Sequence, residues 1–184
     1  VEAIFPILDS FDVKYTKNVL SAHRTPHEVM DLIKTSENNG CKVFIAAAGM
    51  AAHLAGAVAA HTTRPVIGIP IESGGMGGID SLLSTAMMPP GVPVATVAVG
   101  KSGAKNSAIL AVQILATADE NLSAQLTDYK NNMRDDVLKK DKALNSKLST
   151  KSLDVFESID WLNNGKILIH PTEGVWGLGC DAFD

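Results

Sequence analysis

Residues 42–70 read KVFIAAAGMAAHLAGAVAAHTTRPVIGIP, and this stretch decides the fold class. It opens with a continuous apolar run, passes through an Ala-rich segment and closes with a second apolar run, PVIGIP. Continuous apolar runs are typical of parallel strands buried on both faces, and Ala is the strongest helix former. The stretch therefore predicts a strand, a turn, a helix and a second strand, which is one unit of a parallel α/β sheet.

The flanking sequence repeats this alternation with short connections. The pattern predicts strands at 13–22, 42–48, 65–70 and 92–100, and helices at 2–10, 26–39, 79–88 and 104–117. For the helix at 26–39, Thr25 is the expected N-cap, Pro26 suits the first helical position and Glu28 completes a capping box. The whole order predicts a doubly wound α/β domain with a parallel sheet.

The character of the chain changes after Asp119. Apolar residues at helical spacing predict one amphipathic helix with a mixed-charge solvent face; they are Leu122, Leu126, Tyr129, Met133 and Val137. A polar linker at 146–151 follows it. Beyond the linker, LDVFESIDWLNNG predicts a short capped helix, and KILIHPTEGVWGLGCDAFD predicts a strand, a turn and a further segment.

Composition excludes several classes of function. Hydrophobic residues make up 46% and charged residues 20% of the chain, and the net charge of −4 gives no basic surface for nucleic acid or an anionic membrane. The apolar residues 43–60 are interrupted by Gly and His, so they fit a buried strand and helix better than a membrane span. Two cysteines make no disulfide framework, and a reducing cytoplasm is expected.

The residues suited to catalysis follow predicted strands, where ligands bind in an open parallel sheet. Ser21, His23 and Arg24 stand side by side in the first such loop. The imidazole of His23 can carry a proton, and the guanidinium of Arg24 has the forked donor geometry that suits phosphate. Gly49 and His53 follow the second strand. A surface role for His23, a local ion pair for Arg24 and a buried structural role for His53 remain as alternatives. The spacing offers no metal cluster.

Four blocks of the chain resemble the N5-carboxyaminoimidazole ribonucleotide mutase family of purine biosynthesis, over roughly residues 1–145. They are SAHRTP, AGMAAHLAGAVAAHTTRPVIGIP, GIDSLLSTAMMPPGVPVATVAVG and AKNSAILAVQILA. The resemblance implies a flavodoxin-like three-layer α/β/α sandwich, a homo-octamer, a ribonucleotide substrate and no metal or cofactor. It also implies that carbon dioxide leaves the exocyclic nitrogen and is captured at C4.

The same resemblance assigns site residues. It makes His23 the catalytic acid and base, and Arg24 the contact for the substrate phosphate. It implies that the other substrate-binding positions are Ser21, Ala22, Ala48, Gly49, Met50, Ala51, His53 and Leu54. Met50 stands where the family usually has glycine, and the family's opening strand with its GSxSD phosphate loop is expected upstream of Val1.

Alternatives to the mutase therefore stay open. They are direct carboxylation of aminoimidazole ribonucleotide, and a non-catalytic nucleotide-binding subunit. The end of the chain, residues 152–184, resembles the start of the threonylcarbamoyl-adenylate synthase family through HPTEGVWGLG, which allows a bifunctional fusion with a tRNA-modifying enzyme. The expected organisation is a domain at 1–145, a linker at 146–151 and this appended segment, in which Trp161, Val175 and Trp176 would be exposed or loosely docked.

Overall fold

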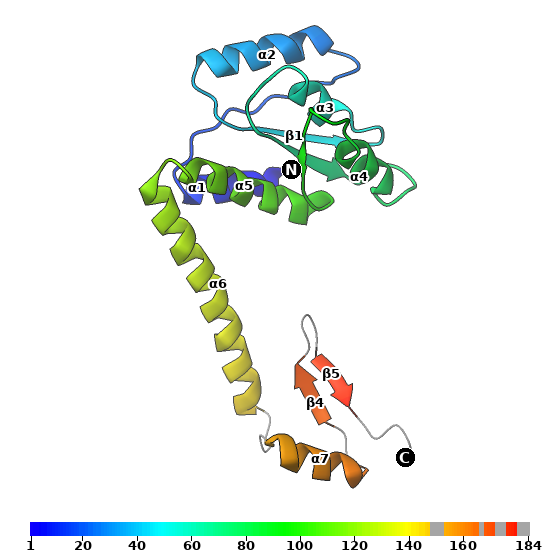
Figure 1. Cartoon of the computed structure of the whole chain (residues 1–184), viewed down its shortest axis with the longest axis vertical. Coiled ribbons are helices and arrows are strands. Elements are labelled where there is room, and N and C mark those ends of the chain that lie inside the picture. The colour runs from blue at the N-terminus through cyan, green and yellow to red at the C-terminus, as the bar shows by residue number, and fades with distance from the viewer. Residues whose placement is uncertain (148–152, 166–167, 172–175, 180–184) are drawn as a thin grey trace. The chain divides into compact units, whose positions relative to one another are not determined.

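The computed structural model describes residues 1–147, 153–165, 168–171 and 176–179 (Figure 1). Contacts between residues divide the chain into two compact units, Val1–Asn132 and Met133–Asp184. The candidate site lies entirely within the first.

The first unit alternates helices and strands as the apolar runs predict. Its elements are a 3₁₀ turn at Glu2–Ile4, α1 Phe5–Ser10, α2 Pro26–Asn38, β1 Phe44–Gly49, α3 Leu54–Ala59, β2 Val66–Ile71, α4 Ile79–Ala86, β3 Ala95–Thr96, α5 Gly100–Ala116 and the first part of α6 Glu120–Lys147. The strands form a parallel sheet in the order β1-β2-β3, with Phe44 opposite Val66 and Ile67 opposite Ala95.

Two hydrophobic cores cover the two faces of this sheet. Because side chains alternate along a strand, Ile45 and Ala47 of β1 pack against a cluster from α1, α5 and α6, whereas Phe44 and Ala46 pack with residues of α2 and α3. The first cluster is built around Ile4, Leu8, Phe11, Ile69, Ala104, Ala108, Val112, Leu122 and Leu126. The second is built around Val29, Ile33, Ala46, Ala55, Val58 and Val66. This three-layer, flavodoxin-like α/β/α arrangement confirms the predicted fold class.

The predicted strand at 13–22 is wrong. Residues 13–20 belong to no helix or strand, and the side chain of Val19 is 100% exposed. A β-rich pattern becomes a strand only beside a hydrogen-bonding neighbour. Within the described residues, β1 pairs with β2 along one edge, and no strand pairs with its other edge.

Two helical predictions also need correction. Thr25 occupies the N-cap position of α2, but its side chain makes no capping bond there, because its hydroxyl bonds to Ser21 instead. In α6, Leu122 and Leu126 are buried as predicted, whereas Met133 and Val137 are 55% and 64% exposed. The helix runs on to Lys147, through the first residues of the predicted linker.

The apolar stretch 43–60 divides between β1 and α3, so its interpretation as a strand and a helix is confirmed. No described helix has both the length and the apolar character needed to cross a membrane.

The second unit contains the end of α6, α7 Val155–Asn163, and an antiparallel pair of β4 Leu168–Pro171 and β5 Trp176–Gly179. The predicted cap of α7 is confirmed, because Asp154 accepts a hydrogen bond from the Glu157 amide at 2.8 Å and Glu157 accepts one from the Asp154 amide at 3.2 Å. Trp161 is partly exposed, as expected. Val175 and the side chain of Trp176 lie outside what the structure describes.

Candidate active site

The loop before α2 is closed by hydrogen bonds between Ser21 and Thr25. The Thr25 hydroxyl accepts a bond from the Ser21 amide at 2.8 Å and donates to the Ser21 carbonyl at 3.0 Å, and the Thr25 amide donates to that same carbonyl at 2.9 Å. The Ser21 hydroxyl accepts a further bond from the Arg24 amide at 3.3 Å. These bonds fix the backbone on both sides of His23.

His23 meets His53 across 30 residues of sequence. Nε2 of His23 lies 2.7 Å from Nδ1 of His53, and the ring centroids are 4.8 Å apart with the planes at 74°. One N–H lies between the two nitrogens, so Nδ1 of His23 and Nε2 of His53 stay available to a ligand. Both side chains are exposed, so His53 is not a buried structural histidine.

His53 is placed by a strained turn at the end of β1. Met50 and Ala52 have φ angles of 55° and 23°, a region that side chains other than glycine rarely adopt. The Ala52 amide donates to the Gly49 carbonyl at 3.1 Å, and Ala52 is buried. His53 then takes the N-cap position of α3. Strain of this kind clusters at functional sites.

The Gly-rich loop that follows β2 reaches the same place. A Cβ added to Gly49 would lie 1.8 Å from Ser73 Oγ and 2.9 Å from Ser73 Cβ, so the Ser73 side chain covers the end of β1. The first loop thus contacts the second through the two histidines, and the second contacts the third at Gly49. The three loops therefore meet at the carboxyl end of β1.

Arg24 is exposed beside the histidine pair, and no described carboxylate forms an ion pair with it. Its guanidinium is thus free to bind an anion. Within the described parts of the chain, no three His, Cys, Asp or Glu side chains are placed to hold a metal ion. The arrangement suits transfer of a proton next to a bound anionic group.

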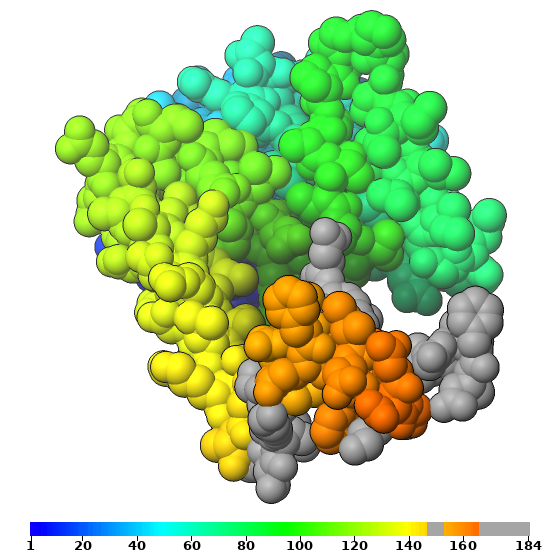
Figure 2. Space-filling model, turned by 60° about the horizontal axis from the view of Figure 1, so that its bottom comes forward, coloured from blue at the N-terminus to red at the C-terminus, as the bar shows by residue number. Residues whose placement is uncertain are grey.

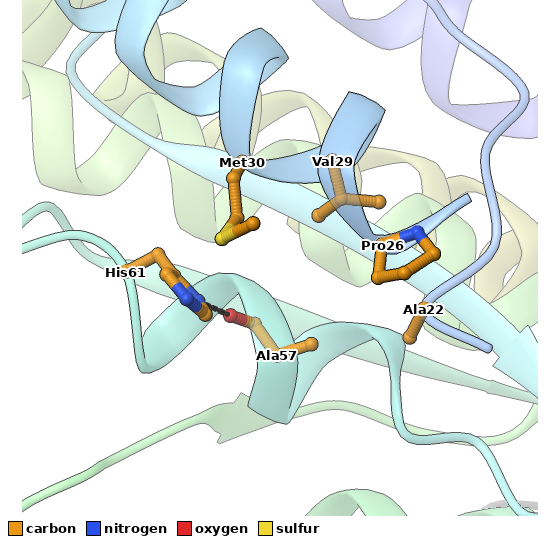
Figure 3. A pocket seen from close by; sticks show the side chains of 6 residues that line it. All are labelled: Ala22, Pro26, Val29, Met30, Ala57 and His61. Carbon is orange, nitrogen blue, oxygen red and sulfur yellow. Dashed lines mark hydrogen bonds between the residues drawn. The ribbon is translucent and has the colours of Figure 1, made fainter.

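The remaining predicted site residues differ in their surroundings. Met50 and Ala51 are exposed, and Ala48 lies near the end of β1. Leu54 packs against the second hydrophobic core. Ala22 lines a small pocket between α2 and α3, together with Pro26, Val29, Met30, Ala57 and His61 (Figure 3). Sequence reasoning missed the contact with Ser73; the only available signal was a glycine at the end of an apolar strand.

Comparison with known proteins shows the family. Residues 1–136 match the family model described as AIR carboxylase. The chain belongs to the AIR carboxylase family. It is 51% identical over 132 residues to the N5-carboxyaminoimidazole ribonucleotide mutase of Bacillus subtilis (strain 168), covering 72% of this chain and 82% of the relative. The protein of the same name from Escherichia coli (strain K12) is 47% identical over 132 residues, covering 72% and 78%.

A solved structure agrees with this family assignment. The crystal structure of Treponema denticola PurE superposes with a TM-score of 0.69 at 26% identity, covering 81% of this chain and 89% of that one. The layered fold of this chain is therefore also the fold of that solved structure.

Proposed function

We propose that the chain is an isomerase of purine biosynthesis that converts N5-carboxyaminoimidazole ribonucleotide to its 4-carboxy isomer. The observation that carries the proposal is the hydrogen-bonded pair of His23 and His53 beside the exposed Arg24, with which no described carboxylate forms an ion pair. It is supported by curated relatives that bear the mutase name at 51% and 47% identity.

The chemistry needs one proton carrier. The N–C bond of the carbamate breaks, carbon dioxide leaves, and the exocyclic nitrogen takes up a proton. Carbon dioxide then forms a C–C bond at C4 of the imidazole, and C4 loses its proton. Because one proton is given and one is removed, a single group near neutral pKa can perform both transfers, and no oxidant or metal is required for the balance.

His23 performs these transfers in the proposal. Its hydrogen bond to His53 leaves Nδ1 of the His23 ring open to the substrate. His53 sets the orientation of that ring, in the way that a base is oriented by its partner in other acid–base sites. Arg24 holds the ribose phosphate with a forked pair of hydrogen bonds.

The experiment compares His23→Asn with His27→Asn. Both histidines are exposed, but His27 lies in the first turn of α2 and has no hydrogen bond to His53. We expect His23→Asn to lower kcat by about two to four orders of magnitude, the usual scale of acid–base catalysis, and His27→Asn to change it little. Equal activity in the two variants would refute the role of His23.

Direct carboxylation of aminoimidazole ribonucleotide is a second candidate, because the matching family model carries that description. The two reactions differ in the substrate that is consumed. Turnover of the N5-carboxy substrate at low bicarbonate supports the mutase. Turnover of aminoimidazole ribonucleotide that rises with dissolved carbon dioxide, without use of the N5-carboxy substrate, supports the carboxylase.

We also propose a homo-octamer, which a face of α4 supports. Residues 73–100 contain a single charged residue, Asp80. Ile79 and Leu83 of α4 and its C-cap residue Met87 are exposed at a spacing of four. Figure 2 shows this green segment at the surface. A face with a single charged residue can pair with its own copy at little electrostatic cost. Leu83→Glu should lower the mass measured by light scattering, whereas Lys101→Glu, at an exposed charged position, should not.

Residues 152–184 are proposed to form a separate segment with the resemblance to the threonylcarbamoyl-adenylate synthase family described above. Val155 and Phe156 of α7 are exposed, at 73% and 83%, so this helix has an apolar surface available for packing.

We place the protein in the cytoplasm, where free thiols such as that of Cys41 persist.

A further inference from the structure

The helix α3 carries His53 at its N-cap and is too short to fix its own direction. It has six residues, Leu54–Ala59, whereas isolated helices shorter than about 12–15 residues are marginal in water. Its position therefore depends on the residues that pack against its sides. Because the hydrogen bond from His23 ends on the N-cap of α3, whatever supports this helix also supports the histidine pair.

Two of the three sides of α3 are supported unequally. Ala55 and Val58 are buried in the second hydrophobic core, so their side of the helix packs toward the sheet. Successive helical residues point about 100° apart, which places Gly56 and Ala57 on opposite flanks of this buried side. The Ala57 flank faces α2 across the small pocket (Figure 3). A gap on that flank means that α2 alone does not hold α3 in place.

Met88 packs against the opposite flank. A Cβ added to Gly56 would lie 2.9 Å from Met88 Cε and 3.1 Å from Met88 Sδ, and no other described atom outside α3 comes within 4 Å of it. The Met88 side chain is half-buried. Its thioether therefore rests on the backbone of α3, at a position where the absence of a side chain allows this close approach.

The segment that carries Met88 is itself held firmly. Pro89 and Pro90 follow directly, and each proline ring fixes its own φ near −65°. In the preceding helix, Thr85 is buried, and its methyl group packs against Gly68 of β2. Met88 thus extends from a restrained segment onto a short helix that lacks full support on its other flank.

We infer that Met88 is a positioning residue, which holds α3 toward α2 and keeps His53 within hydrogen-bond reach of His23. Loss of the thioether would open space on the Gly56 flank, and α3 would move into that space and away from α2. Because His23 belongs to the loop before α2, the 2.7 Å distance between its Nε2 and Nδ1 of His53 would lengthen. The inference rests on the proposed function only for its effect on turnover.

The structural test uses crystals of the full chain without ribonucleotide. We expect Met88→Ala to separate the two ring nitrogens beyond about 3.5 Å, where a hydrogen bond is lost. Met88→Leu conserves volume and should keep the bond. Gly56→Ala combined with Met88→Ala places a methyl group in the vacated space and should restore it. Met88→Val also lacks both contacting atoms and serves if Met88→Ala does not fold. An unchanged nitrogen–nitrogen distance in the folded Ala or Val variant would overturn the inference.

The kinetic test is made well below the Tm of every variant, so that a loss of stability alone leaves kcat unchanged. We expect Met88→Ala to lower kcat about 10- to 100-fold, the scale of a displacement of about 1 Å. KM for the ribonucleotide should change far less, because Arg24 lies in the loop before α2 and not on α3. Met88→Leu should retain most of kcat, and the double variant should recover severalfold.

Met133→Ala is the matched control, because Met133 of α6 is 55% exposed and makes no contact with Gly56. It should match wild type in kcat. An equal loss of kcat in Met88→Ala and Met133→Ala, or no recovery in the double variant, would overturn the positioning role. Absence of turnover in the wild type, together with a lengthened bond in Met88→Ala, would instead contradict the proposed function and support the role of Met88.

Discussion

Gly49→Ala tests the contact that joins two of the three loops. The new Cβ would lie 1.8 Å from Ser73 Oγ, 2.9 Å from Ser73 Cβ and 3.0 Å from the Ile71 carbonyl oxygen. Rotation of the Ser73 side chain moves Oγ but leaves Cβ too close, so the loop backbone itself must shift. Overpacking of this kind costs about 1–3 kcal/mol of stability, and a loop displaced by about 1 Å can cost roughly 100-fold in rate.

Ser73→Gly supplies the matched control, because it removes both Ser73 atoms that the new methyl group meets. Urea denaturation and turnover of wild type, Gly49→Ala, Ser73→Gly and the double variant would measure the coupling between the two positions. We expect the double variant to recover about 1–2 kcal/mol of the loss, with recovery incomplete because the Ile71 carbonyl stays at 3.0 Å. An unchanged urea midpoint for Gly49→Ala, or a cost that Ser73→Gly does not reduce, would refute the placement of Ser73 over β1.

Two further predictions concern the anion contact and the end of the chain. Arg24→Lys keeps the charge and loses the forked geometry, so it should raise KM for the ribonucleotide more than it changes kcat; an unchanged KM would contradict phosphate binding. Deletion of residues 152–184 should leave turnover and oligomeric mass unchanged and improve solubility, because it removes the exposed Val155 and Phe156. A fall of many degrees in Tm would show that this segment stabilises the first domain.

The sequence predicted those elements whose own pattern determines them. The apolar runs around 44–49 and 66–71 became β1 and β2, because a strand buried on both faces needs no polar side. The prediction of a strand at 13–22 was wrong. Alternation of apolar and polar residues shows only that a segment can pair with a strand, and no described strand lies beside this one. The predicted burial of Met133 and Val137 was wrong for a similar reason, because α6 continues past the hydrophobic core that contains Leu122 and Leu126.

The candidate site was predictable in its members and not in its contacts. Position after a predicted strand pointed to His23, Gly49 and His53, although the strand predicted before His23 is absent from the structure. Their geometry depends on how two loops cross, and no pattern within either loop encodes the 2.7 Å bond between His23 and His53. The same limit applies to Thr25, whose hydroxyl serves as well for a loop bond as for a helix cap.

The turn from Met50 to His53 shows how the fold sustains this geometry. Left-handed backbone costs a residue with a Cβ about 1–2 kcal/mol, and Met50 and Ala52 both adopt it within three residues. The surrounding structure holds them there: Ala52 is buried, its amide bonds to the Gly49 carbonyl, and the His53 carbonyl accepts the Ala57 amide at 2.9 Å. Relaxation of the turn would therefore rotate the start of α3. Because α3 carries His53 at its N-cap and Ala57 one turn later, such a rotation would disturb both the histidine pair and the small pocket that Ala57 lines. The strained turn from Met50 to His53 therefore holds both the histidine pair and the Ala57 side of the pocket in place.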